Sequence, residues 1–355
     1  MGIGTALDKD AQAMKASIES LTKIRVIGVG GGGSNAVNNM IAQDIQSVDF
    51  VAVNTDAQAL IRSIAPARLR IGDKLTRGLG VGGDPKLGRF SAEENRNEIA
   101  KAIQGSDLLF ITAGMGGGTG TGAAPVIAEI ASELGVLTVA VVTRPFSFEG
   151  AHRAKVAEEG IAQLREKADT IVVIHNDRLL SLCDENVSIE AAFKLADDML
   201  CQSVRGIYDV ISNIEHINLD FNDVKTIMNR AGQAWIAIGR GSGRTRAVDA
   251  ARAVIVNPLF DFSIENAKRI LFNIMGNELT LIEVSEAANV IKQVADPEAQ
   301  IIFGFGSDTE LDRVVKITLI ATDFSPAKKK SVVNNEDFVT IAVGSDRQPL
   351  YQRMK

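Results

Sequence analysis

From residue 23 onward, the chain alternates short apolar runs with stretches in which apolar and polar residues mix at helical spacing. The apolar runs are rich in β-branched residues and hardly alternate, which is typical of strands buried on both faces of a parallel sheet. This order predicts a doubly wound α/β domain with a mainly parallel sheet. The predicted strands are 24–29, 50–53, 108–111, 136–142 and 170–174, and the predicted helices are 35–43, 93–104, 123–134 and 152–167.

A long helical stretch at 189–212 separates this domain from a region with a different pattern. That region holds three alternating segments, typical of strands with one solvent-facing side, and two helical stretches. The predicted strands are 277–284, 299–306 and 313–322, and the predicted helices are 247–256 and 285–295. We expect a polar lead-in (1–22), the α/β domain (23–188), a central connecting helix (189–213), a smaller α+β domain (214–324) and a flexible tail (325–355).

Composition and charge narrow the class of protein. The 355 residues include 38 Lys and Arg against 44 Asp and Glu, a net charge of −6, so no basic stripe favours nucleic acid as a partner. Two cysteines exclude a disulfide scaffold, and we expect no protein-built metal site. No apolar run approaches the ~20 residues that span a bilayer, and no signal-peptide core is visible. These features predict a cytoplasmic protein without direct membrane insertion.

Glycine-rich segments follow two of the predicted strands, where a parallel sheet binds ligands. The first, at 28–35, places backbone N–H groups and a helix N-terminus where an anion can approach. Within it, Gly28, Gly30 and Gly33 match G-x-G-x-x-G, and Asp56 follows near the end of the second strand. Taken alone, this segment favours a dinucleotide-dependent oxidoreductase as much as any other nucleotide site.

The second segment, at 113–122, adds two threonine hydroxyls to a longer glycine cradle before another helix. A third glycine loop lies at 80–85, and no G-x-x-x-x-G-K-[ST] sequence occurs. Three such loops suit a polyphosphate held mostly by backbone, which a dinucleotide fold does not need.

The run Gly-Met-Gly-Gly-Gly-Thr-Gly-Thr-Gly at 114–122 resembles the signature of the tubulin/FtsZ family. Segments 28–35, 145–150, 176–180 and 218–224 occur in the order found in the FtsZ branch, over about residues 23–324. The resemblance implies a GTP-binding, GTP-hydrolysing cytoskeletal protein that polymerises head to tail and forms the cytokinetic ring at mid-cell in bacterial division.

The resemblance also implies the site residues. Mg²⁺ is implied because a triphosphate site with few cations needs neutralising charge, and phosphates and water commonly hold this ion. Base recognition by an aspartate suits guanine, whose N1–H and N2–H₂ both donate. The phosphate residues would be Gly31, Gly32, Asn35, Gly114, Gly116, Gly117, Gly118, Thr119 and Gly120, with Glu149 and Arg153 at the ribose and phosphate end and Asn176, Phe193 and Asp197 at the base.

An acidic loop follows the long helix. Considered alone, Asp220 beside a helix start favours a capping role. In the family, this loop completes the GTPase site of the neighbouring subunit, which implies that Asp220 and Asp223, with Asn218, polarise the attacking water. A site split between opposite poles predicts a heterologous contact and therefore a filament.

The sequence departs from the family pattern at 214–216, at 235–241 and at Asn277, where the family usually has glycine. The first two departures leave open the alternative of a filament that binds nucleotide without hydrolysing it. The end of the tail, 346–355, resembles the terminal peptide of the family. Pro349, Leu350, Tyr351 and Arg353 are therefore predicted to dock membrane adaptors and division regulators.

Overall fold

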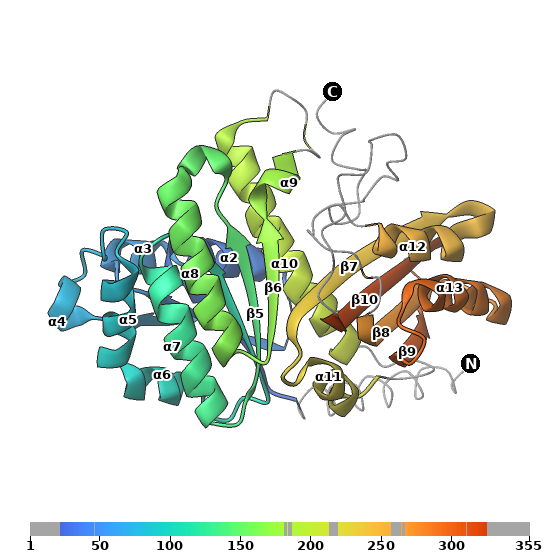
Figure 1. Cartoon of the computed structure of the whole chain (residues 1–355), viewed down its shortest axis with the longest axis horizontal. Helices are drawn as coiled ribbons and strands as arrows, with labels where there is room; N and C mark the ends of the chain where they lie inside the picture. Colours follow the sequence, from blue (N-terminus) through green and yellow to red (C-terminus); the bar gives the residue numbers. More distant parts are fainter. Residues whose placement is uncertain are drawn as a thin grey trace, which may run out of the picture. The chain divides into compact units, whose positions relative to one another are not determined.

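The computed structural model describes residues 22–45, 47–180, 183, 187–212, 219–256, 264, 267–309 and 311–324. The chain divides into two compact units, Met1–Ile171 and Val172–Lys355, and the boundary falls within strand β6 (Thr170–His175). Each unit is described separately below (Figure 1).

The first unit is built on a parallel sheet. Its strands lie in the order β3-β2-β1-β4-β5, and every neighbouring pair is parallel. The central strands are buried almost throughout because helices cover both faces, which confirms the α/β prediction. The strands are β1 (Ile24–Val29), β2 (Val48–Asn54), β3 (Ala67–Arg70), β4 (Leu108–Gly114) and β5 (Leu137–Arg144).

Helices connect these strands, and Figure 1 shows α7 and α8 in front of the strands with α2 behind them. α2 begins at Gly30 and not at 35, because the glycine segment itself forms the first helical turn. The predicted helix 93–104 corresponds to α6, which starts after Asn95, and α5, which ends at Glu94, was not predicted. The helices are α2 (Gly30–Ala42), α3 (Ala57–Arg62), α4 (Asp73–Thr76), α5 (Pro85–Glu94), α6 (Arg96–Ile103), α7 (Thr119–Glu133), η1 (Ser147–Glu149) and α8 (Ala151–Lys167).

The second unit contains the long helix α10 (Ile189–Ser212), which matches the predicted helix, and a mixed sheet. The strand order is β7-β10-β8-β9, with β10 antiparallel to β7 and β8, and β8 parallel to β9. The remaining elements are α9 (Asn176–Leu180), α11 (Phe221–Met228), β7 (Gly232–Ser242), η2 (Gly243–Thr245), α12 (Arg246–Ile255), β8 (Ala267–Gly276), α13 (Leu281–Val294), β9 (Gln300–Ser307) and β10 (Val314–Phe324).

The strand predicted at 277–284 is wrong. Glu278 has a left-handed φ of 51°, which turns the chain, and Thr280 then caps α13 through a capping box with Glu283. The alternation in this segment therefore reflects a turn followed by the first turn of an amphipathic helix. Among the described helices, none is long and apolar enough to cross a bilayer.

Candidate nucleotide site and acidic loop

Two helix N-termini without side-chain caps lie side by side in the first unit. α2 follows Val29 and α7 follows Gly118, and neither cap residue supplies a side-chain hydrogen bond. A Cβ placed on Gly30 would stand 2.9 Å from the Gly120 nitrogen, and one on Gly32 would stand 3.2 Å from the Gly114 nitrogen. The first-turn N–H groups and the positive dipole ends of both helices therefore gather in one place, which is an anion-binding arrangement.

The N-terminal turn of α2 has a buried face that packs on the sheet and an exposed face. Gly33 is buried, and a Cβ there would lie 2.3 Å from the Thr112 carbonyl oxygen, so this face fixes α2 against β4. Gly31, Gly32 and Asn35 are exposed, and a Cβ on Gly31 would meet nothing within 4 Å. The structure thus brings the two predicted phosphate segments together and leaves the predicted residues of α2 on the open side.

The third glycine loop borders the same cradle. A Cβ on Gly118 would lie 2.9 Å from the Asp84 nitrogen, and one on Gly88 would lie 2.4 Å from the Gly118 oxygen. Asp84 caps α5 by accepting a hydrogen bond from the Lys86 N–H at 2.8 Å. Loop 80–85 and α5 are therefore packed directly on the turn that begins α7.

The cradle also contains hydroxyl groups of Thr55, Ser34 and Thr112, which were not predicted from the sequence, beside those of Thr119 and Thr121, which were. Thr55 and Thr119 share a hydrogen bond between their Oγ1 atoms at 2.7 Å, and Thr121 Oγ1 accepts from the Gly116 N–H at 2.8 Å. Ser34 Oγ and Thr112 Oγ1 are buried without a hydrogen-bond partner among the described residues. The sequence feature that could have revealed these hydroxyl groups is the presence of small polar residues where β1, β2 and β4 end.

Glu149 and Arg153 form an ion pair at the edge of the cradle, with Arg153 Nη1 2.7 Å from Glu149 Oε2. The Glu149 carboxylate is almost fully buried and accepts a hydrogen bond from the Phe146 N–H at 2.9 Å, so it holds the turn before α8. The Arg153 guanidinium is half exposed and lies 3.9 Å from where a Cβ on Gly117 would be. Both residues therefore stand beside the predicted phosphate segment.

The three predicted base residues belong to the second unit. Asn176 begins α9 directly after β6; it is 4% exposed, and its Oδ1 has no hydrogen-bond partner among the described residues. Phe193 and Asp197 are one helical turn apart on α10, so they share a face. Phe193 is 41% exposed. Burial raises the pKa of Asp197 from 3.8 to about 7, with a smaller like-charge contribution from Asp198. An unsatisfied amide, an exposed ring and a desolvated carboxylate fit a heterocyclic base.

The acidic loop forms a capping box at the start of α11. Asp220 Oδ1 accepts from the Asp223 N–H at 2.8 Å, and Asp223 Oδ2 accepts from the Asp220 N–H at 3.1 Å. The capping interpretation of Asp220 is confirmed. The box uses one oxygen of each carboxylate, so the second oxygen of each has acceptor capacity for water.

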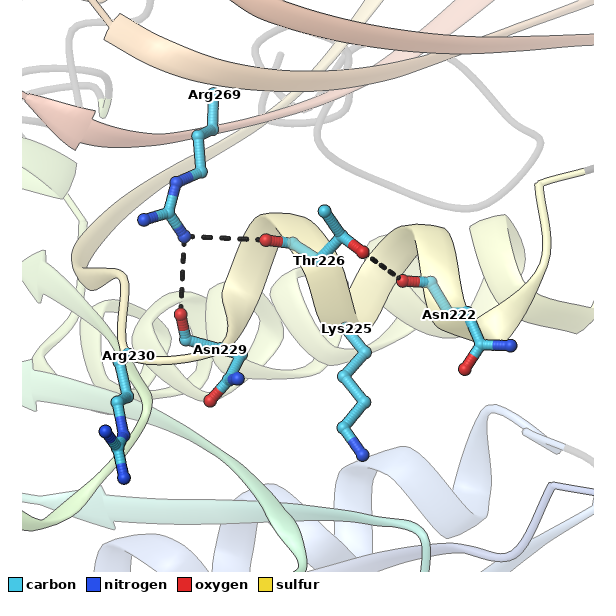
Figure 2. Close-up of a pocket in the computed structure, with 6 residues that line it drawn as sticks. All are labelled: Asn222, Lys225, Thr226, Asn229, Arg230 and Arg269. Carbon is cyan, nitrogen blue, oxygen red and sulfur yellow. Dashed lines mark hydrogen bonds between the residues drawn. The ribbon is translucent and has the colours of Figure 1, made fainter.

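A polar cavity of about 510 Å³ flanks the same helix (Figure 2). Arg269, on β8, donates from Nη1 to the carbonyl oxygens of Thr226 at 3.4 Å and Asn229 at 3.3 Å, so it anchors the C-terminal end of α11. Figure 2 shows Lys225 extending from the side of α11 away from Arg269, and Arg230, which follows the helix, extending to the same side. The capping box and Arg269 together fix α11 at both ends.

Some predicted residues lie outside the described part of the chain, namely Asn218, the departure at 214–216 and the terminal Pro349, Leu350, Tyr351 and Arg353. Asp56, which suggested a dinucleotide, caps α3 by accepting from the Gln58 and Ala59 N–H groups. Across the described residues, no three His, Cys, Asp or Glu side chains group as metal ligands.

Comparison with known proteins identifies the family. The Tubulin/FtsZ family GTPase domain matches residues 23–184, and the FtsZ family C-terminal domain matches residues 232–325. The chain is similar to an FtsZ dimer from M. jannaschii, at 41% identity and TM-score 0.81, covering 93% of this chain and 99% of that one. A mutant of M. jannaschii FtsZ gives 43% identity and TM-score 0.80, covering 89% and 96%. CetZ2 from Haloferax volcanii, at 21% identity, TM-score 0.75 and coverage of 87% and 95%, shares the fold.

Proposed function

The chain belongs to the tubulin/FtsZ family of GTPases, and we propose that it polymerises head to tail into filaments whose subunits hydrolyse GTP. The observation that carries the proposal is the pair of uncapped helix N-termini joined backbone to backbone at Gly30 and Gly120. Such a cradle recognises phosphate through main-chain donors, so no P-loop lysine is required. The family membership replaces the oxidoreductase alternative.

The phosphates are held by the exposed side of the α2 start and by the turn at 114–120. Arg153 adds one positive charge beside this turn, although Glu149 already balances it. A triphosphate therefore brings more negative charge than these side chains neutralise. Mg²⁺ fits this deficit because it binds through phosphate oxygens and water, and when bound it would neutralise charge that develops on the phosphates during hydrolysis.

Guanine is recognised by side chains of the second unit. The Asp197 carboxylate accepts from guanine N1–H and N2–H₂, and adenine offers no such donor pair on that edge. Asn176 supplies a buried amide whose Oδ1 has no hydrogen-bond partner among the residues that the structure describes, and Phe193 supplies an exposed side chain on the same helix as Asp197. These three residues set the base specificity of the site.

Asp220 and Asp223 act on the nucleotide of a neighbouring subunit and orient the attacking water with their unused carboxylate oxygens, and Asn218 assists them. The capping box supports this role because it holds both carboxylates rigidly at the tip of α11. A relative with 41% identity is described as a dimer, and a repeated heterologous contact extends such a pair into a filament. Nucleotide hydrolysis would then reset the contact.

The decisive experiment measures GTP turnover per subunit against protein concentration. We expect the rate per subunit to rise with concentration, because each active site needs a neighbour. Asp220→Asn keeps a good N-cap but removes the charge, so it should bind GTP normally and hydrolyse it slowly. Mixed into the unmodified protein, it should also slow the neighbours it supplies. A constant rate per subunit down to dilutions without polymer would contradict the shared site.

In the cell, this activity suits the cytokinetic ring at mid-cell in bacterial division, assembled in the cytoplasm. The terminal residues Pro349, Leu350, Tyr351 and Arg353 would link the filament to membrane adaptors and division regulators. A fluorescent fusion of the full chain should form a mid-cell band, and a fusion lacking 345–355 should form filaments that are not recruited there.

A further inference from the structure

A fully buried threonine beside the phosphate cradle directs its hydroxyl group at the start of α7. Thr55 follows β2 directly and is 0% exposed, and its Oγ1 lies 2.7 Å from Oγ1 of Thr119, the first residue of α7. Among the described residues, this contact is the one hydrogen bond that the Thr55 hydroxyl makes. The pair therefore joins the end of β2 to the turn that begins α7.

The backbone of Thr55 is held on both sides. Its N–H donates to Oδ1 of Asn54 at 2.9 Å, and its carbonyl oxygen accepts from the Gly80 N–H at 3.3 Å and from Thr76 Oγ1 at 3.4 Å. A β-branched side chain is also restricted at χ1. The Thr55 hydroxyl is therefore fixed in position toward Thr119.

The burial of the two threonines sets the direction of their hydrogen bond, although either oxygen could donate at this distance. If Thr119 donated, the Thr55 proton would be left without an acceptor in a residue that water does not reach, which is unfavourable. If Thr55 donates, the proton of Thr119 remains available at a residue that is 8% exposed. A Cβ on Gly30 would lie 3.4 Å from the Thr119 Cβ, so this side chain lies against the start of α2, inside the cradle.

We propose that Thr55 is a positioning residue for phosphate binding, which donates to Thr119 and so orients the Thr119 hydroxyl to donate to a phosphate oxygen. The inference rests on the proposed function, in which the turn at 114–120 holds the phosphates of GTP. Phosphate oxygens are strong acceptors, so a bound nucleotide would favour the same direction of donation. Because Thr55 is fully buried, it acts through Thr119 and does not contact the nucleotide.

Two substitutions separate the hydroxyl group of Thr55 from its shape. Thr55→Val keeps the shape and removes the hydroxyl, so a non-hydrolysable GTP analogue should bind about fivefold more weakly, the loss expected for one hydrogen bond. Thr55→Ser keeps the hydroxyl and loses a buried methyl group, so its melting temperature should fall while its affinity stays within about twofold of the unmodified chain. A role in packing alone would give the reverse order of affinities.

Thr138→Val is the matched control, because it removes another fully buried threonine hydroxyl near the amino end of β5, whereas the cradle lies at the carboxyl ends of the strands. It should leave the affinity unchanged. In a Thr119→Val background, Thr55→Val should cause no further loss of affinity, because the group that it positions is gone. Melting curves verify that each variant is folded.

Two results would overturn the positioning role. One is equal affinity of Thr55→Val and the unmodified chain, and the other is an equal loss from Thr55→Val with and without the Thr119 hydroxyl. Failure of the unmodified chain to bind the analogue would instead contradict the proposed function and, with it, the role of Thr55.

Discussion

Asp197 provides a quantitative test of guanine recognition through the pH dependence of GTP binding. Burial raises its pKa to about 7, so without nucleotide the side chain is largely protonated below that pH. In the proposed function the carboxylate accepts the guanine hydrogen bonds, so GTP binding would have to remove this proton. Protonation raises the apparent dissociation constant for GTP by the factor 1 + 10^(pKa − pH), which is roughly 11 at pH 6 and roughly 1.1 at pH 8. GTP should therefore bind about tenfold more weakly at pH 6.

The assay is calorimetric titration of the full chain with a non-hydrolysable GTP analogue, below the concentration that gives polymer. Asp197→Asn should bind more weakly at pH 8 and lose this pH dependence, because it has no titrating carboxyl. Asp198→Asn is the matched control. It removes the neighbouring like charge, so the pH at which GTP affinity is half changed should move to a lower value. Equal affinities at pH 6 and pH 8, or an unchanged profile in Asp197→Asn, would refute this assignment.

The same carboxylate should lower the stability of the nucleotide-free protein. Its folded-state pKa of about 7 exceeds the ordinary value of 3.8, so its stability contribution is greatest below pH 3.8 and is lost as pH rises through 7. The loss has an upper bound of about 4 kcal/mol. Without nucleotide, Asp197→Asn should therefore melt at a higher temperature than the unmodified chain at pH 8, and the difference should shrink toward pH 4.

Three further predictions test other parts of the proposal. Gly33→Ala would place a Cβ 2.3 Å from the Thr112 oxygen, so we expect its unfolding free energy to fall by several kcal/mol. Gly31→Ala should fold normally and lose GTP affinity. Equal melting temperatures in the two variants would contradict this. Asp220→Ala should hydrolyse GTP slowly, form persistent filaments by sedimentation and, lacking its cap, lose about 1 kcal/mol of stability, whereas Asp220→Asn should keep that stability. Deleting 345–355 should leave GTPase activity and sedimentation intact and abolish adaptor recruitment, so loss of polymer would show that these residues do more than dock a partner.

The α/β unit was largely predictable because its strands are buried on both faces. A continuous apolar run such as 108–111 is typical of a strand buried on both faces, and the glycines that follow it mark the start of the next helix. The second unit was harder to predict. The β7 strand contains Gly239 and Gly241, which are poor strand formers, and they occur there because a Cβ on either would collide with the α12 backbone. Such a contact between distant segments leaves no local pattern.

The candidate site likewise has a part that the sequence predicts and a part that it does not. The glycine segments identified the cradle because main-chain recognition requires glycine runs. The Thr55–Thr119 pair and the buried Ser34 and Thr112 hydroxyls depend on how three strand ends meet, which a single sequence does not reveal.

Under the proposed function, the phosphate cradle and the predicted base residues should respond differently to inhibitors. At the cradle, the groups proposed to recognise the phosphates are backbone N–H groups. A Cβ added to several of the glycines that carry them would lie within 3.5 Å of another glycine-rich segment. A substitution there cannot delete the hydrogen-bond donor, and a side chain at Gly30, Gly118 or Gly120 would disturb folding before it disturbed the ligand, which leaves few sites such as Gly31 for change. Escape from a compound that imitates the phosphates should therefore be rare. Resistance to a compound that imitates guanine should arise readily at Asn176, Phe193 and Asp197, where side chains would make the proposed contacts.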